Sequence, residues 1–193
     1  MGSEFELKYK ATPEILSAVL ATLPGQVQHF EMRTTYYDTV HRLLAGRHWT
    51  LRRRIENGVS ICTFKTPGAD GARREFEVEC DDIMEGVSML CKLSRERVLA
   101  GFASTGLVEV CGAAFHRIAI TVQLEGAVAE VALDQGKPLG GGKEQPLCEL
   151  EVEQKSGDRN AVIAFASALA DRFGLEPEPK SKFRRAADLA GGM

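Results

Sequence analysis

The sequence has no CxxC cysteine pair, no long apolar run and no strong excess of charge of either sign. Its five cysteines are scattered and odd in number, so we expect them to be reduced, as in a cytosolic protein. No apolar run approaches the about 20 residues that span a bilayer, and the N-terminus lacks the basic and then apolar pattern of a secretory signal. We therefore expect a cytoplasmic protein without a membrane partner.

The near balance of charges excludes further classes. The 24 Lys and Arg residues against 27 Asp and Glu residues give a formal net charge of −3, which gives no sign of nucleic-acid binding. The composition, 44% hydrophobic and 26% charged, is typical of a globular protein. Because we find no linker and no internal repeat, we predict a single domain over residues 1–193.

Apolar and polar residues alternate along much of the chain, which is the period of a β-strand. The pattern predicts strands at residues 2–10, 27–39, 50–68 with a turn at Asn57-Gly58, 73–80, 107–136 and 147–154. It predicts helices at 12–23, 82–104 and 157–175, and a flexible glycine-rich loop at 137–146. An antiparallel sheet of this size has to hide its edges. We therefore predict a mainly β (α+β) fold, an eight-stranded antiparallel β-barrel tunnel with helices packed outside.

The polar faces of these strands carry charges that are segregated by sign. Side chains at i and i+2 share a face, so "CELEVE" places Glu149, Glu151 and Glu153 together without a base. For one strand, a face in water is the ordinary explanation of such alternation. Like charges so close repel, however, and the pattern recurs on many strands. This repetition favours charged faces that point into a closed barrel.

An enclosed charged surface needs compensating ligands. Clustered carboxylates bind divalent cations that prefer oxygen ligands, such as Mg²⁺, Mn²⁺ or Ca²⁺. Clustered arginines and lysines bind a polyanion, and the arginine fork suits phosphate. Because an eight-stranded barrel encloses roughly the space of one small ligand, the sequence predicts a metal-bound polyphosphate inside it.

The order of the charged motifs resembles that of the CYTH superfamily, the triphosphate tunnel metalloenzymes. The stretch Glu4-Phe5-Glu6-Leu7-Lys8 resembles the ExExK motif of that family, and "LRRR", "TFK", "REFEVE", "FHRIAI", "ALDQG", "CELEVE" and "KSKF" follow in the family's order. The resemblance runs from residue 4 to residue 182 and is strongest to the bacterial inorganic triphosphatases. Some of those carry a helical CHAD domain after the tunnel domain, and the sequence leaves open whether one belongs here.

The resemblance implies roles for individual residues. It assigns substrate binding to Lys8, Arg52, Arg54, Lys65, Arg117 and Lys182. It assigns metal binding to Glu4, Glu6, Asp134, Glu149 and Glu151, with Glu75, Glu77 and Glu153 helping directly or through water. Catalytic roles fall to Lys65, Glu4 and Glu6, where Lys65 either assists the attacking water or contacts phosphate. We exclude Arg53, which faces the other way, and interpret the arginine pairs at 73–74 and 184–185 as solvated surface.

The resemblance also implies the reaction, which is hydrolysis of the terminal phosphoanhydride of inorganic triphosphate with Mg²⁺ or Mn²⁺. One alternative is an adenylate cyclase or a thiamine triphosphatase with the same site, and another is a polyphosphate-binding module without activity. A homodimer is common among relatives, and the physiological triphosphate and the number of bound metals stay open. The four histidines, His29, His41, His48 and His116, show no metal-binding spacing and receive no role.

Overall fold

The computed structural model describes residues 2–68 and 73–191, except the side chains of residues 2–4. Its strands are β1 (Gly2–Glu4), β2 (Glu6–Lys10), β3 (Val27–Thr39), β4 (Thr50–Glu56), β5 (Val59–Pro67), β6 (Arg73–Glu79), β7 (Leu107–Leu124), β8 (Ala127–Gly140), β9 (Lys143–Glu144), β10 (Leu147–Gly157) and β11 (Glu176–Pro177). Its helices are α1 (Pro13–Leu20), α2 (Ile83–Ser94), α3 (Arg97–Ser104), α4 (Arg159–Phe173) and α5 (Lys182–Leu189), with a short 3₁₀ turn at Ala45–Arg47.

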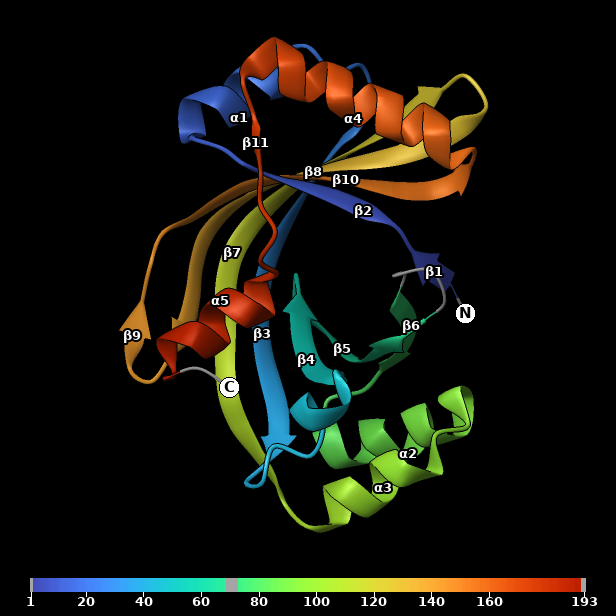
Figure 1. Ribbon diagram of the computed structural model, residues 1–193, viewed down its shortest axis with the longest axis vertical. Helices are drawn as coiled ribbons and strands as arrows, with labels where there is room; N and C mark the ends of the chain where they lie inside the picture. The colour runs from blue at the N-terminus through green and yellow to red at the C-terminus, as the bar shows by residue number, and fades with distance from the viewer. Residues whose placement is uncertain (1, 69–72, 192–193) are drawn as a thin grey trace.

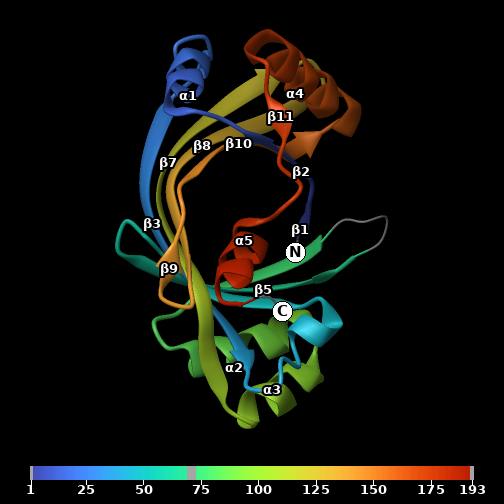
Figure 2. The same ribbon diagram turned by 60° about the vertical axis from the view of Figure 1, so that its left-hand side comes forward.

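One antiparallel sheet curls around a central space, as Figures 1 and 2 show. The strands follow the order β1-β6-β5-β4-β3-β7-β8-β10-β2-β11, and β9 pairs with β8. Only Phe5 separates β1 from β2 in the chain, yet β1 pairs with β6 and β2 pairs with β10. The N-terminal segment therefore links the first strand of this order to β2, which only the two-residue β11 follows.

The predicted fold class is confirmed, with small differences in detail. Eight strands of the described chain have five or more residues, whereas β1, β9 and β11 have two or three. Helices α1 to α4 lie outside the sheet in Figures 1 and 2, whereas α5 lies within its curl. Among the described residues, no helix combines the length and the apolarity needed to cross a membrane.

Two apolar layers on the outside of the sheet explain why the strands alternate. Helices α1 and α4 cover β2, β8 and β10, where Leu150 and Val152 are fully buried. Helices α2 and α3 cover β4 to β6, where Leu51, Phe64 and Phe76 are buried. Because alternate side chains point to opposite faces, burying these residues outside directs their charged neighbours inward.

The glycine-rich stretch predicted as a flexible loop is instead part of the sheet. Strand β8 continues through Gly140, and β9 turns back to pair with it. Helix α5 packs against this hairpin, and a Cβ added at Gly140 would lie 2.1 Å from the carbonyl oxygen of Ala186. The missing side chain therefore lets α5 approach the sheet closely, and this approach positions the first residue of α5, Lys182.

We expect Gly140→Ala to lower the free energy of unfolding by about 1–3 kcal/mol, because the new methyl group collides with the backbone of α5. The matched control is Gly101→Ala in α3, where the space around an added Cβ is open. Alanine there should raise the stability by about 0.5–1 kcal/mol, because it favours the helix. Urea unfolding measures both variants, and equal stability of Gly140→Ala and the parent chain would contradict this packing argument.

Candidate active site

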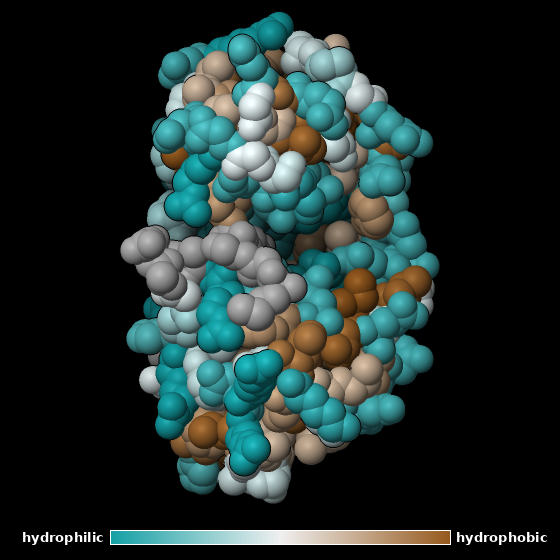
Figure 3. All heavy atoms as spheres, turned by 90° about the vertical axis from the view of Figure 1, so that its right-hand side faces the viewer, coloured by the Kyte–Doolittle hydropathy of each residue, from teal (hydrophilic) through white to brown (hydrophobic). Residues whose placement is uncertain are grey.

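The sheet encloses a cavity of about 510 Å³ that is lined mostly by charged side chains, and we call this cavity the bore. Figure 3 shows the molecule hollowed at mid-height, with hydrophilic side chains around the hollow. Counted over the described side chains, nine lysines and arginines and seven glutamates line the bore. They come from seven strands and from α5, so segments distant in the sequence meet at one place.

The structure brings most of the predicted site residues together in the bore. The lining cations include Lys8, Arg52, Arg54, Lys65, Arg117 and Lys182, and the lining acids include Glu6, Glu75, Glu77, Glu151 and Glu153. Glu4 is placed only by its backbone, which pairs with Arg73, and its side chain lies outside the described part. Asp134 and Glu149 differ from the others because both are fully buried beneath the side chains of Lys182 and Arg185 of α5.

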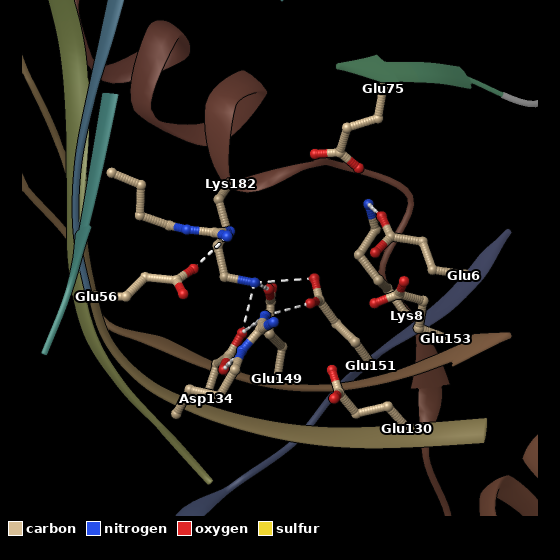
Figure 4. Close-up of polar contacts among 12 residues, drawn as sticks. Glu6, Lys8, Glu56, Glu75, Glu130, Asp134, Glu149, Glu151, Glu153 and Lys182 are labelled. Atoms are coloured by element: carbon tan, nitrogen blue, oxygen red, sulfur yellow. Dashed lines mark hydrogen bonds and ion pairs between the residues drawn. The ribbon is translucent and has the colours of Figure 1, made fainter. Parts of the chain in front are cut away.

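Asp134, Glu149 and Glu151 form a buried acidic cluster that the protein's own cations already neutralise. Strand register pairs Glu149 with Asp134, and the three carboxylates lie within 4.8 Å of one another. Lys182 reaches from α5 to all three of them in Figure 4, with its Nζ atom 2.6 Å from Asp134 and 2.9 Å from Glu151. Arg117 donates two hydrogen bonds to Asp134, at 2.8 and 2.7 Å, and one to Glu151 at 2.6 Å.

The pKa values of this cluster follow from its burial and its ion pairs. Burial alone would raise the pKa of Glu151, but Lys182 and Arg117 outweigh burial and hold that pKa well below its usual value. Burial raises the pKa of Glu149 in spite of the nearby Lys182. Against the opposing effect of burial, the surrounding carboxylates raise the pKa of Lys182. Glu151 and Lys182 are therefore an ionised pair at neutral pH.

A second acidic group, which we call the glutamate row, faces the bore across three strands. Glu153 of β10 pairs directly with Glu6 of β2 on one side and with Glu130 of β8 on the other. All three line the bore, and like charges directly opposite one another destabilise a sheet. Lys8 lies 3.1 Å from Glu6, and Lys155 lies 3.2 Å from Glu153, which partly offsets the repulsion. The row thus offers carboxylate oxygens, the donors that Mg²⁺ and Mn²⁺ prefer.

The basic side chains of β4 and β5 line another part of the bore. Lys65 lies 3.1 Å from Glu75, and Arg54 forms an ion pair with Glu56. Burial, and then the neighbouring Arg52, lower the pKa of Arg54 to about 10, so this guanidinium is still charged at neutral pH. The Nε atom of Arg54 is buried without a hydrogen-bond partner among the described residues. A buried donor of this kind suits an oxygen of an anionic ligand.

Several bore residues were missed from the sequence, although simple spacing rules would have found them. Arg73, Glu56 and Lys155 each lie two positions along a strand from a predicted residue, so they share its face. Arg185 follows Lys182 by about one helical turn and forms an ion pair with the buried Glu149. The prediction of solvated surface is therefore wrong for Arg73, which lines the bore, and for Arg185, which is buried against Glu149 next to it. Arg184 also lines the bore, although its side chain is half exposed. Arg53 donates to the carbonyl oxygen of Asp81 and is absent from the bore lining, in line with its exclusion.

One side of the bore lining is aromatic rather than charged. Phe30, Tyr36 and Phe115 project into it from β3 and β7. Phe183 of α5 packs against Tyr36, with a distance of 4.9 Å between the ring centroids. The Nζ atom of Lys182 lies 5.0 Å from the ring centroid of Phe115, a cation–π distance. The bore therefore combines a charged region with an apolar surface.

Comparison with known proteins shows which family the sequence resembles. The sequence profile of the CYTH domain matches residues 2–187. The chain is 30% identical over 191 residues to the inorganic triphosphatase of Haemophilus influenzae. This alignment covers 96% of the chain and 54% of the relative, so the chain spans about half the length of that protein.

Solved structures share the fold at lower identity. A Hippeastrum protein, described as a putative adenylyl cyclase with a dominant triphosphatase activity, aligns with a TM-score of 0.70 at 19% identity, covering 100% of this chain and 97% of its own. A protein from Pyrococcus horikoshii aligns with a TM-score of 0.63 at 24% identity, covering 93% and 96%. A putative adenylate cyclase from Vibrio parahaemolyticus aligns with a TM-score of 0.60 at 20% identity, covering 93% and 94%.

We expect Lys182→Met to lower the free energy of unfolding at pH 7 by about 3–5 kcal/mol, because it removes a cation shared by three buried carboxylates. Lys182 lowers the pKa of Glu151 in the folded protein below the value of about 4.3 that a glutamate has in the unfolded chain. The stabilisation is therefore complete above that pH and is lost as the pH falls toward the folded pKa. The difference between the two proteins should therefore shrink as the pH falls below that value.

The control for this experiment is Lys180→Met. Lys180 is mostly exposed and pairs with Asp188 at 2.8 Å, so its loss should change the stability by at most about 1 kcal/mol. Urea unfolding over a series of pH values measures both variants. Equal losses for Lys182→Met and Lys180→Met at pH 7 would contradict the role given to the buried cluster.

Proposed function

This chain belongs to the CYTH domain family, and from that premise we propose that it hydrolyses the terminal phosphoanhydride of inorganic triphosphate with the help of Mg²⁺ or Mn²⁺. The observation that carries the proposal is the meeting of six predicted basic side chains, from five separate elements, with a row of glutamates in one cavity. The name of the Haemophilus influenzae relative supports the same reaction.

The charge balance of the bore supports a ligand that brings its own cations. The nine basic and seven acidic side chains described along the bore nearly cancel, and the buried Asp134 and Glu149 add two carboxylates against the one further cation of Arg185. A triphosphate alone would add several negative charges to a partly dehydrated cavity, which is unfavourable. Divalent cations that enter with the triphosphate would restore the balance, which favours a metal-dependent reaction.

The basic side chains are arranged to orient the triphosphate. Arg52 and Arg54 lie on one strand two positions apart, and their forks suit two oxygens of a phosphate group. Lys8 enters from β2, and Lys182 enters from α5. Cations that surround a polyphosphate fix its position and stabilise the charge that develops in the transition state.

The glutamate row is where we place the divalent cation. Glu6, Glu130 and Glu153 line the bore, where a ligand can reach them, whereas Asp134 and Glu149 are fully buried beneath Lys182. The row supplies the hard oxygen donors that Mg²⁺ and Mn²⁺ require, so the residues fit such an ion. When bound, the ion would polarise phosphate oxygens and lower the pKa of a coordinated water.

Lys65 contributes charge rather than general-base catalysis in this proposal. Its Nζ atom lies 3.1 Å from Glu75, so the two side chains form an ion pair. An ammonium group in such a pair can donate a proton but has no lone pair with which to accept one from water. Of the two roles predicted for Lys65, contact with phosphate is thus the one that the geometry favours.

Phosphate release from a panel of substrates tests the proposed reaction. We expect inorganic triphosphate with Mg²⁺ or Mn²⁺ to be hydrolysed fastest, and a chelator to abolish the activity. ATP and thiamine triphosphate belong in the panel because the aromatic side of the bore offers a surface for a ring. Cyclic AMP formed from ATP as the main product, or tight triphosphate binding without turnover, would overturn the proposal.

A pair of neighbouring arginines tests whether alternate side chains of β4 face the bore. Arg54→Ala should lower kcat/KM for triphosphate by about 10²–10³-fold, because it removes a buried charged donor beside the substrate. Arg53→Ala is the matched control on the same strand, since Arg53 donates to the carbonyl oxygen of Asp81 instead. Steady-state kinetics measure both variants, and similar losses from the two would show that strand parity does not decide the site.

A further inference from the structure

The outer surface of the sheet carries a pair of histidines that face away from the bore. Nδ1 of His29, on β3, lies 3.3 Å from Nε2 of His116, on β7, and the ring centroids are 5.3 Å apart. The neighbours of these residues, Phe30 on one strand and Phe115 and Arg117 on the other, line the bore. The two histidines are 87 residues apart in the chain, so no short spacing motif could reveal them.

A carboxylate lies on the same outer face as the two rings. Glu31 pairs directly with His116 across the two strands and lies two positions from His29 on its own strand. Directly paired residues have Cβ atoms about 4.5–5.5 Å apart, so a rotation of the Glu31 side chain can bring its carboxylate to the ring of His116. His29 and Glu31 are exposed and His116 is partly exposed, so an ion from solvent can reach all three.

The backbone beneath these side chains is held in place by Asn57. Its Oδ1 atom accepts a hydrogen bond from the amide of Glu31 at 2.8 Å, and its Nδ2 atom donates one to the carbonyl oxygen of His29 at 2.9 Å. Glu31, His116, Asn57 and Gln135 all line a second hollow, of about 490 Å³. Gln135 pairs with His116 from β8 and adds another oxygen donor beside the rings.

We propose that His29, His116 and Glu31 bind a divalent transition-metal ion, with Zn²⁺ as the reference case. In a tetrahedral site with Zn–N distances of about 2.0–2.1 Å, two ring nitrogens lie about 3.4 Å apart. The separation of 3.3 Å matches this spacing. Imidazole with carboxylate is a donor set suited to Zn²⁺, Ni²⁺ and Cu²⁺, and water or Gln135 completes the coordination.

The donor chemistry separates this site from the bore. Mg²⁺ prefers oxygen ligands, which the glutamate row offers, whereas the two imidazoles favour softer ions. A bound ion would join β3 to β7, the two strands that carry Tyr36 and Arg117 on their inner faces. The same 3.3 Å distance could also be a hydrogen bond between neutral imidazoles, and direct metal binding distinguishes the two explanations.

Isothermal titration with Zn²⁺, in the presence of saturating Mg²⁺ to occupy oxygen sites, tests the proposal. We expect the parent protein to bind one equivalent that the double variant His29→Ala/His116→Ala loses. Glu31→Gln should weaken this binding by about tenfold, since it replaces a charged ligand by a neutral one. The matched control is His41→Ala, an exposed histidine in a turn, which should leave the isotherm unchanged.

Two further measurements make the result decisive. Co²⁺ in place of Zn²⁺ should give the visible absorption of a tetrahedral nitrogen and oxygen site in the parent protein and in His41→Ala, but not in the double variant. Triphosphate hydrolysis with Mg²⁺ should be the same in all variants, so the outcome is independent of the proposed function. Equal Zn²⁺ affinity and stoichiometry in the parent and the double variant would overturn the site.

Discussion

The neutralisation of buried carboxylates by Lys182 and Arg117 is the constraint on which the rest of this structure depends. Asp134 and Glu149 are completely buried, and their charges would be very unfavourable there without cations close by. Lys182 begins α5 and Arg117 lies in the middle of β7, so one set of ion pairs joins the C-terminal helix to the sheet. The same two cations also line the bore. The ion pairs that stabilise the fold therefore lie directly beside the proposed substrate site.

The bore follows from closing a sheet whose strands have one apolar and one charged face. Apolar residues such as Leu150 and Phe64 find their partners in the helices outside, which leaves the charged residues to face one another inside. Strand register then decides which charges meet. It sets Lys8 against Glu151 and Lys65 against Glu75, but it also aligns Glu153 with Glu6. Opposite charges that pair across strands stabilise the sheet, whereas the aligned glutamates repel one another, and Lys8 and Lys155 offset this repulsion in part.

The two faces of the central strands offer different chemistry at a short distance from each other. On β7, Arg117 and Phe115 face the bore, while His116 between them faces outward beside His29. The inner face of these strands is aromatic and basic, and the carboxylates that suit hard divalent ions reach the bore from other strands. The outer face instead presents two imidazoles, the ligands that softer ions prefer. Alternation along a single strand is thus enough to create two distinct environments.

The sequence by itself determined the mainly β fold, the eight longer strands and most of the bore residues, because side-chain direction in a strand depends only on position along the chain. The same rule places Arg73 on the face of Glu75 and Glu56 on the face of Arg54, although the sequence was interpreted with Arg73 in solvent and with no role for Glu56. It could not place Asp134 and Glu149 behind Lys182, nor His29 beside His116. Those contacts depend on the register between distant strands and on the close approach of α5 at Gly140, and only the folded chain decides them.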